Sequence, residues 1–455
     1  MKILYALHRF LPRFFSGTEI YTYYLAQEMQ RLGHEAQIFC AEEVNKGTDC
    51  RITAQSDIYN GLRVHRINFN RKKVPDIIRF SYDNPIVSDY FQSLLSAIQP
   101  DLIHITSFLN LSMAILDPIK KGAIPTVFTA TDYWCFCPKT NFLDFDGRLC
   151  TTADVKRCLA CLISSSPLFE RVMKKLRVSS LGLAKLFMVL EWLPGTKKNP
   201  YIKGIKALEE RTHVILEKLK YVDLIITPTP NLRKFFLTAG LLPEKILFSG
   251  NGLNVKRLKK HNYHLPENPL RFGYIGLLAQ LKGVDVLIRA FTNLSSSNHA
   301  SLSIYGDDSH FPHYAQKVKK LAQKNPAIFF LGTFHPDKLG KKLADIDVLI
   351  VPSVCYENAP TVISEAFATG IPVVGSDVPG ISCLVKDEVN GLLFARGDEQ
   401  ALTRCLARLL QEPDLLPRLR KNVPAVKSIQ ENGHELEEIY YKLIKNQTKI
   451  APTMT

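Results

Sequence analysis

The sequence predicts an α/β protein of two domains, each with a parallel β-sheet covered by helices on both faces. A chain of 455 residues is longer than one hydrophobic core usually organises. Short runs rich in branched and aromatic residues alternate with longer helical patterns, which is typical of parallel sheets. A polar, basic stretch at 253–268 separates two such series, so we expect two Rossmann-like halves joined by a linker.

The first series predicts an N-terminal domain over residues 1–255. A helical pattern at 19–32 follows the first expected strand and ends at Gly33, a helix-stop signal. The alternation breaks off at about 135–221, where we expect a cysteine-rich helical insertion. The expected strands are 2–7, 36–40, 63–68, 101–106, 125–130, 223–227 and 245–249.

The second series predicts a C-terminal domain over residues 256–425. The expected strands are 271–275, 301–305, 328–331, 348–351 and 372–375. A last helical pattern at 433–445 lies in the segment 426–455, which we expect to pack back toward the N-terminal domain.

Composition excludes a disordered chain. Hydrophobic residues make up 46% and charged residues 22% of the sequence, as in ordinary globular proteins. No run of 18 uninterrupted apolar residues occurs, and "MKILYALHRF" is too short in apolar content to be a signal-peptide core. We therefore expect a cytoplasmic protein without a membrane span.

The net charge of +15 indicates an acidic partner. Between residues 171 and 206, nine Lys or Arg stand against a single acid, Glu191, and are interleaved with Trp192 and other apolar residues. Such a segment is typical of attachment to an anionic membrane surface, here the inner face of the membrane, or of a solvated helical face within the protein. No nucleic-acid-binding module is visible, so nucleic acid is not an expected partner.

The stretch "YENAPTVISE" (356–365) predicts an anion site. It follows the expected strand 348–351, and ligands of open α/β sheets bind beyond the carboxyl ends of such strands. Pro360 suits a first helical position, so a helix is expected from residue 359 or 360 to 368. The first amides of that helix and the positive end of its dipole would attract an anion. These amides belong to Asn358, Ala359, Thr361 and Val362.

Two acids flank these amides. Glu357 precedes them, and Glu365 lies about 7 Å further along the helix at 1.5 Å per residue. The two could hold both ends of a nucleotide sugar, with Glu357 at the sugar, the amides at the phosphates and Glu365 at the ribose hydroxyls. The alternative is that both are ordinary surface charges near a helix start.

Two further motifs carry candidate binding groups. Lys282 follows the expected strand 271–275, where its ammonium could neutralise a diphosphate, although an ordinary surface lysine is the alternative. The motif "SGTE" (16–19) opens a helix after the first strand, so Gly17 would let the backbone approach a ligand. A plain strand-to-helix turn is equally consistent with that motif.

Four of the ten cysteines, Cys137, Cys150, Cys158 and Cys161, lie within 25 residues. A C-x2-C pair is common in metal sites and tetrahedral zinc accepts four thiolates, so a structural zinc is one expectation. Irregular spacing and the absence of an expected leader favour reduced thiols over disulfides, and buried or idle thiols are the alternative to a metal. Cys135 is a spare candidate ligand.

The segment "YENAPTVISEAFATGIPVVGSDVPGI" resembles the donor-site signature of glycosyltransferase family 4. The resemblance covers most of the chain apart from 137–220. It implies the GT-B fold, in which two Rossmann-like domains face a cleft, and retaining transfer of a sugar from a nucleoside-diphosphate sugar such as a UDP- or GDP-sugar. Three other segments resemble the same family: "HRFLPRFFSGTEIYTYYLAQEMQRLGHEAQIF", "TDYWCFCP" and "RFGYIGLLAQLKGVDVLIRAF".

The resemblance also implies residue roles. The catalytic residues would be Glu357, Lys282 and Asp132, with the lysine contacting the donor diphosphate. The acceptor side would comprise Gly17, Thr18, Thr131 and Asp132. No divalent metal would be required, because the lysine and the helix amides would stabilise the leaving diphosphate. The donor-binding residues would be Gly17, Gly276, Lys282, Asn358, Ala359, Pro360, Thr361 and Glu365.

The chain departs from the family pattern at three positions. Thr131 stands where many relatives have histidine, Leu277 where an arginine often pairs with the lysine, and Cys383 where many have a further acid. A hydroxyl carries no charge near neutral pH, so a mechanism that needs an imidazole at residue 131 is in doubt. The leading interpretation is a retaining glycosyltransferase acting on a glycan or lipid-linked glycan in cell-surface polysaccharide or glycoconjugate biosynthesis. The alternatives are a non-catalytic, sugar-nucleotide-binding regulatory partner and a sugar-nucleotide epimerase.

Overall fold

The computed structural model describes residues 1–45, 47–151, 153–163, 200–258, 269–294 and 299–450, together with residues 182, 185 and 189. The chain divides into two units: unit 1 contains Met1–Asn251 and Gln430–Thr455, and unit 2 contains Gly252–Ile429. The sequence places these boundaries after residues 255 and 425. Most of the basic segment 171–206 lies outside the described residues.

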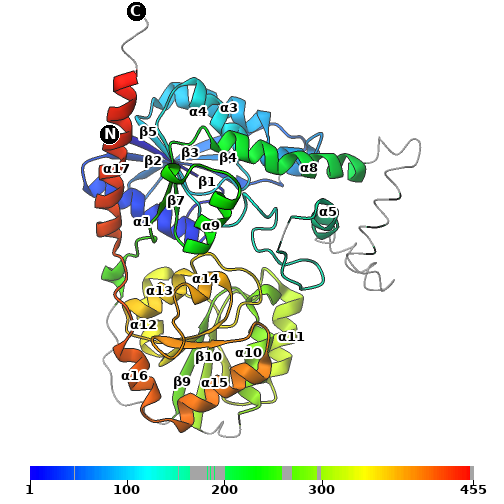
Figure 1. Ribbon diagram of the computed structural model, residues 1–455, viewed down its shortest axis with the longest axis vertical. Coiled ribbons are helices and arrows are strands. Elements are labelled where there is room, and N and C mark those ends of the chain that lie inside the picture. Colours follow the sequence, from blue (N-terminus) through cyan, green and yellow to red (C-terminus); the bar gives the residue numbers. More distant parts are fainter. Residues whose placement is uncertain are drawn as a thin grey trace, which may run out of the picture. The chain divides into compact units, whose positions relative to one another are not determined.

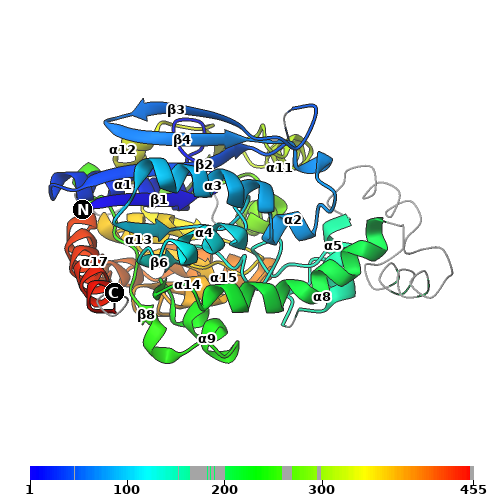
Figure 2. The ribbon, with the colours of Figure 1, turned by 90° about the horizontal axis from the view of Figure 1, so that it is seen from above.

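Unit 1 is built on an eight-stranded sheet with the order β3-β4-β2-β1-β5-β6-β7-β8 (Figure 1). Neighbouring strands run parallel except β3, which pairs antiparallel with β4 at one edge (Figure 2). The seven expected strands are all present. Only β3 is unexpected, because six of its seven residues are exposed and leave no apolar pattern. The strands are β1 (Lys2–Leu7), β2 (Glu35–Glu43), β3 (Thr53–Tyr59), β4 (Leu62–Asn68), β5 (Leu102–Ile105), β6 (Thr126–Thr129), β7 (Leu224–Thr227) and β8 (Ile246–Phe248).

Two helices of unit 1, α3 and α9, begin at a capping residue followed by proline. Asn84 caps α3 by accepting hydrogen bonds from the amides of Ile86 and Val87, and Pro85 occupies the first turn. Thr229 caps α9 in the same way. The helices are α1 (Gly17–Arg31), α2 (Arg79–Tyr82), α3 (Pro85–Ile98), α4 (Leu116–Lys121), α5 (Val155–Ile163), α8 (Pro200–Leu219), α9 (Pro230–Thr238) and α17 (Ile429–Ile450).

The C-terminal helix α17 packs against unit 1 through buried polar contacts. The Tyr440 hydroxyl bonds Nδ1 of His104 on β5 and lies 3.5 Å from the Tyr5 hydroxyl on β1. Burial lowers the pKa of His104 to about 3, so its ring stays neutral at physiological pH. Tyr21 of α1 donates to Asn432 at 3.1 Å. These contacts explain why this helix belongs with unit 1.

Unit 2 is built on a six-stranded parallel sheet with the order β11-β10-β9-β12-β13-β14. The five expected strands are present, whereas β14 was not predicted because a short apolar run fits a buried helix equally well. The strands are β9 (Leu270–Ile275), β10 (Ala300–Tyr305), β11 (Ile328–Phe330), β12 (Val348–Val351), β13 (Val373–Ser376) and β14 (Gly391–Phe394). The helices are α10 (Val284–Thr292), α11 (Pro312–Ala322), α12 (Leu339–Ala344), α13 (Thr361–Ala368), α14 (Pro379–Ser382), α15 (Glu399–Gln411) and α16 (Leu415–Lys421).

Two hydrophobic cores cover the two faces of the unit 2 sheet. On β12, Val348 and Ile350 pack into the core formed with α10, α11 and α15. Leu349 and Val351 pack into the core formed with α12, α13 and α14. Figure 1 shows α12 and α13 on the opposite side of the strands from α10 and α11. Burial on both faces explains why β12 is apolar at every position.

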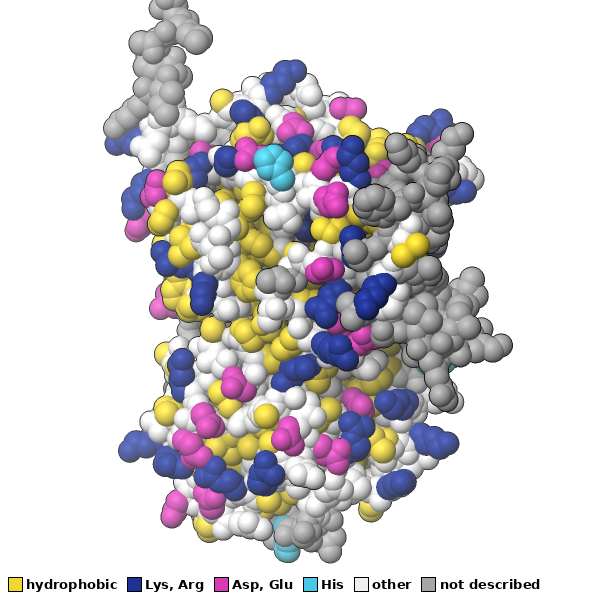
Figure 3. Space-filling view, turned by 45° about the vertical axis from the view of Figure 1, so that its right-hand side comes forward, with side chains coloured by type: hydrophobic (Ala, Val, Ile, Leu, Met, Phe, Trp, Pro, Cys, Tyr) yellow, Lys and Arg dark blue, Asp and Glu magenta, His cyan; other side chains and the backbone are white. Residues whose placement is uncertain are grey.

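Among the described residues, basic side chains do not cover the face seen in Figure 3 as one continuous patch. Lys and Arg side chains are interspersed with Asp and Glu over both units on that face. In the part of the chain that the structure describes, no helix combines the length and apolar character needed to cross a membrane.

Candidate active site

In unit 2, polar side chains meet at the carboxyl ends of β9 and β12, which are neighbours in the sheet. β9 leads through the 3-10 helix η6 (Gln280–Lys282) into α10, and β12 leads through the loop 352–360 into α13. The amide of Val354 donates to the Leu281 carbonyl at 2.9 Å and ties these two connections together. Strand ends in open α/β sheets are the usual place for ligands.

Lys282 and Glu357 form an ion pair at this position. Lys282 Nζ donates to Glu357 Oε1 at 2.5 Å, and Ser353 Oγ donates to the same oxygen at 2.6 Å. The two charged side chains keep 29% and 12% of their surface exposed. Burial alone would lower the pKa of Lys282, but the Glu357 carboxylate outweighs it and the pKa is raised. Lys282 is therefore a cation at physiological pH and is partly open to an incoming anion.

Two glycines hold the backbone around this pair. Gly283 has a φ of +67°, and a Cβ there would lie 2.0 Å from the Pro352 carbonyl oxygen. A Cβ at Gly380 would lie 1.9 Å from the Glu357 carbonyl oxygen. Neither approach leaves space for a side chain, so glycine is required at both positions.

Helix α13 begins at Thr361 with Pro360 as its N-cap, within one residue of the predicted start, and ends at the predicted Ala368. Glu365 does not lie open on this helix: its side chain is 10% exposed and accepts from Arg257 Nη2 at 2.7 Å. Burial raises the pKa of Glu365, and Arg257 opposes that rise. No local sequence signal indicates this partner, and a ribose contact by Glu365 stays a prediction.

The remaining donor-side candidates surround the same loop. Gly276 follows β9, and its amide donates to the Tyr305 carbonyl at 3.0 Å. Asn358 is buried, whereas Ala359 and Thr361 are half-buried. Arg396, which follows β14, donates to the Val354 carbonyl at 2.9 Å. This second cation could not be predicted from the sequence, because no local motif connects it to the loop.

In unit 1, polar side chains gather at the carboxyl ends of β1, β5 and β6. Gly17 is the first residue of α1, and the next residue, Thr18, donates to the Thr131 hydroxyl at 2.9 Å. Thr131 in turn donates to the Thr106 carbonyl at 2.7 Å, so its only hydroxyl proton is committed to the backbone. We call the following residues the unit 1 polar cluster: His8, Ser16, Thr18, Glu19, Ser107, Thr131 and Asp132.

The unit 1 polar cluster contains an imidazole, His8, to which the sequence motifs assigned no role. His8 Nε2 lies 3.3 Å from Glu19 Oε1, with side-chain exposures of 12% and 2%, and Ser16 donates to the other oxygen of Glu19. Asp132 accepts from the Trp134 amide at 2.8 Å and from Ser107 Oγ at 3.4 Å. Burial raises the pKa of Asp132, and the Trp134 amide and nearby His8 oppose that rise. The available signal for His8 was its position as the first polar residue after β1.

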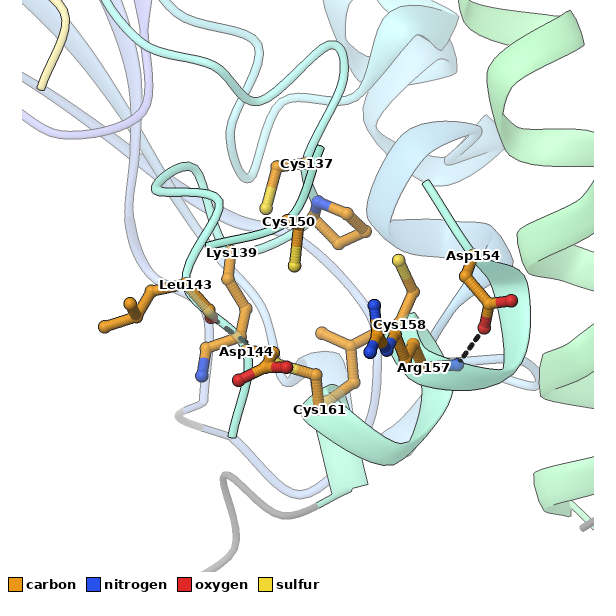
Figure 4. Close-up of a pocket in the computed structure, with 11 residues that line it drawn as sticks. Cys137, Lys139, Leu143, Asp144, Cys150, Asp154, Arg157, Cys158 and Cys161 are labelled. Atoms are coloured by element: carbon orange, nitrogen blue, oxygen red, sulfur yellow. Dashed lines mark hydrogen bonds between the residues drawn. The ribbon is translucent and has the colours of Figure 1, made fainter. Parts of the chain in front are cut away.

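The four cysteines of the predicted metal site line a single pocket in unit 1 (Figure 4). All four are free thiols. Cys135 does not line this pocket; it is buried elsewhere, and its carbonyl accepts from Arg211 Nη1 at 3.3 Å. Among the described residues, no three Cys, His, Asp or Glu side chains stand in a metal-holding arrangement.

Two family models match the chain. Glycosyltransferase Family 4 matches residues 15–151, which contain most of the unit 1 polar cluster, and Glycosyl transferases group 1 matches residues 269–412, which contain Lys282 and Glu357.

Relatives and solved structures agree with these models. An uncharacterised glycosyltransferase of Methanocaldococcus jannaschii is 35% identical over 180 residues, 37% of this chain but only 46% of that protein's length. The amylovoran biosynthesis glycosyltransferase AmsK of Erwinia amylovora is 24% identical over 365 residues, 70% of this chain and 88% of that protein. The structure of Anabaena HepE in complex with UDP-glucose matches with a TM-score of 0.60 and 15% identity over 99% of this chain and all of that one. The chain belongs to the glycosyltransferases of the family 4 type and has their GT-B fold.

Proposed function

We propose that this chain transfers a sugar from a nucleoside-diphosphate sugar to a glycan or lipid-linked glycan, with retention of the anomeric configuration. The Lys282–Glu357 pair carries the proposal, because a charged, partly exposed lysine at strand ends is suited to a diphosphate. HepE, which has the same fold, is described with UDP-glucose, which supports a UDP-sugar as the donor, and a GDP-sugar is the other candidate.

The chemistry follows from charge. When the sugar–phosphate bond breaks, the leaving diphosphate gains negative charge, which Lys282 and the amides at the start of α13 would stabilise. Before the donor binds, Glu357 balances Lys282. The diphosphate would then take over as the lysine's partner and release the Glu357 carboxylate toward the sugar. In the scheme that the family resemblance implies, the acceptor oxygen bonds to the anomeric carbon on the face that the diphosphate leaves, and a phosphate oxygen takes the acceptor's proton.

The acceptor is proposed to bind at the unit 1 polar cluster, near Gly17, Thr18 and Asp132. Carboxylates and an imidazole are suited to the hydroxyl groups of a glycan, which donate as well as accept hydrogen bonds. Because AmsK is described as an amylovoran biosynthesis enzyme, the proposed setting is cell-surface polysaccharide biosynthesis.

Residues 171–206 are proposed to attach the protein to the inner face of an anionic membrane, where a lipid-linked acceptor would lie. Flotation with anionic vesicles should recover the protein, and reversing charges between Lys174 and Lys206 should abolish recovery. Reversal of the exposed Lys320 in unit 2 is the control. Equal flotation on neutral and anionic vesicles would refute this attachment.

Turnover of a panel of UDP- and GDP-sugars, chosen first by thermal shift, tests the function. Wild type and Lys320→Ala should release diphosphate in an acceptor-dependent reaction, whereas Lys282→Ala and Glu357→Gln should release it far more slowly. Tight donor binding without turnover in wild type would support the regulatory alternative. Interconversion of the donor without an acceptor would support an epimerase.

A further inference from the structure

The cysteine pocket of unit 1 plays no part in the proposed transfer chemistry. It is formed by two segments: the loop 137–150 contributes Cys137 and Cys150, and α5 contributes Cys158 and Cys161 (Figure 4). Residues three apart lie on the same face of a helix, so Cys158 and Cys161 face the loop together. The fold therefore brings a helical C-x2-C pair to two further thiols.

The loop is folded back tightly on itself. Leu143 and Leu149 form an antiparallel bridge, and the Cys150 amide donates to the Phe142 carbonyl at 2.8 Å. Phe142 and Thr140 have φ values of +50° and +66°, which disfavour residues with a β-carbon. This conformation costs free energy and places Cys150 at the same pocket as Cys137.

The apolar core that holds α5 is small. The buried residues Leu159 and Ala160 of α5 pack with Ile205 and Leu208 of α8, and the two helices lie side by side in Figures 1 and 2. The partly buried residues packed against this core are Ile78, Val155, Cys158 and Leu162. A core of this size supplies little stability, and small folded elements commonly depend on disulfides or a structural metal. The cysteines lie where such a crosslink would join the loop to α5.

We propose that Cys137, Cys150, Cys158 and Cys161 bind one Zn²⁺ as a structural site. Because no three of these side chains are arranged as ligands in the described residues, the thiols must rotate toward a common centre, with zinc–sulfur distances of about 2.3 Å. Each thiol loses its proton to solvent on binding.

Charges around the pocket are compatible with this site. Four thiolates and one Zn²⁺ carry a net charge of −2. Lys139 and Arg157 line the pocket together with Asp144 and Asp154. These acids are already engaged, since they accept the amides of Arg148 and Arg157 at 2.8 and 2.7 Å. Lys139 and Arg157 would oppose the charge of the thiolates, and the two carboxylates would add to it.

Elemental analysis of the full-length protein, purified from zinc-supplemented cells without chelators, tests the proposal. Wild type should hold about one equivalent of zinc, and the Cys158→Ser/Cys161→Ser double variant should lose it. Cys50→Ser, outside the pocket, and Cys135→Ala, next to it in sequence, should keep it. Because the double variant could misfold, Co²⁺ should also be exchanged into wild type, where tetrahedral thiolate coordination gives visible d–d and sulfur-to-cobalt absorption bands.

Three results would overturn the proposal. These are metal-free wild type whose pocket thiols all react with a thiol reagent, a disulfide between two pocket cysteines found by mass spectrometry, or zinc retained by the double variant. None of these readouts requires transferase activity, so the metal site and the proposed function can fail separately.

Discussion

Both units place polar side chains at the carboxyl ends of parallel strands, but the two sites differ in charge. In unit 2, Lys282 is matched to Glu357, and Arg396 adds a cation beside the same loop. In unit 1, two carboxylates, Glu19 and Asp132, lie with a single imidazole, His8. Cations suit a diphosphate, whereas carboxylates suit sugar hydroxyls. One kind of strand-end geometry can thus serve two chemically different ligands.

The charged residues of the two sites also differ in what shifts their pKa values and in how they affect stability. The pKa of Lys282 is raised because Glu357 outweighs the effect of burial. The pKa of Asp132 is raised because burial outweighs its partners. An under-compensated carboxylate weakens the folded state at neutral pH, so we expect Asp132 to serve binding or catalysis rather than stability.

Replacing Lys282 should have the largest effect on activity. Lys282→Ala removes the cation opposite the leaving diphosphate and should lower kcat about 10²- to 10³-fold, the cost of losing one preorganised charge-stabilising donor. Initial rates with radiolabelled donor measure this, with Lys320→Ala as the matched control. A loss below about threefold would show that the diphosphate does not depend on Lys282.

Replacing Asp347 should have the largest effect on stability. It accepts from Arg271 at 2.9 and 3.0 Å and from Arg420 at 3.2 Å, and it is 2% exposed. Asp347→Asn should lower the free energy of unfolding by about 3 kcal/mol at neutral pH, as measured by urea denaturation. The 74% exposed Asp337, changed to Asn, is the control and should change it little.

The difference in stability between wild type and Asp347→Asn should depend on pH, in a direction set by the pKa shift of Asp347. Burial would raise the pKa of Asp347, but the bonds from Arg271 outweigh it and the folded-state pKa is lowered. The Asp347 carboxylate therefore stabilises the fold above its pKa in the unfolded chain, which is about 4. This stabilisation is lost as the pH falls through the pKa of Asp347 in the folded protein. Wild type and Asp347→Asn should therefore converge in acid. A difference that grows below about pH 4 would contradict the ion-pair account.

A smaller loss of stability is expected at Gly283. In Gly283→Ala, alanine would have to adopt a positive φ, and its Cβ would clash with the Pro352 carbonyl. The free energy of unfolding should therefore fall by about 2 to 3 kcal/mol. Gly370→Ala is the matched control, because its φ is +81° but no atom lies within 4 Å of the new Cβ. It should cost only about 1 kcal/mol. Equal losses in urea denaturation would show that the close approach to Pro352 is not energetically important.

Replacing Asp132 should have the smallest effect on activity, and it tests whether unit 1 binds the acceptor. Asp132→Asn should slow transfer to acceptor about tenfold, the loss of one hydrogen bond to a charged group, while donor hydrolysis by water is retained. Parallel assays with and without acceptor separate these reactions. Equal slowing of both would place Asp132 on the donor side.

The effect of pH on stability should have opposite signs for Asp132 and Asp347. Because the folded-state pKa of Asp132 is raised, its stabilising contribution is present below its ordinary value of 3.8 and is lost as the pH rises through the folded value. Asp132→Asn should thus be at least as stable as wild type at neutral pH, by the same urea measurement. A clear loss of stability would show that the ionised carboxylate is structural.

Much of unit 2 could be predicted because its signals are local. An apolar strand followed by Pro360 fixed the start of α13 to within one residue, and strand-end placement brought Lys282 and Glu357 together. The partners of Glu365 and of the 352–360 loop were not predictable, because Arg257 and Arg396 are brought there by tertiary packing alone.

Unit 1 was less predictable for two physical reasons. The exposed edge strand β3 lacks the apolar alternation on which strand prediction depends. His8 opens the segment 8–39 that resembles the family, but no role followed from that position, because the pairing of β1 with β5 and the folding of α1 place it beside Glu19 and near Asp132. Thr131 stands where many relatives have a histidine, yet an imidazole is present in the same cluster because His8 follows a different strand, β1.

Calorimetric titration with nucleoside diphosphates tests the central claim most directly, because it isolates the diphosphate contact from catalysis. For whichever of UDP and GDP binds wild type, Lys282→Ala should weaken the diphosphate by about tenfold or more, the value of a charge-assisted bond. The same change should leave the parent nucleoside unaffected, and Lys320→Ala should match wild type. Undiminished diphosphate affinity in Lys282→Ala would contradict the assignment of this lysine to the donor.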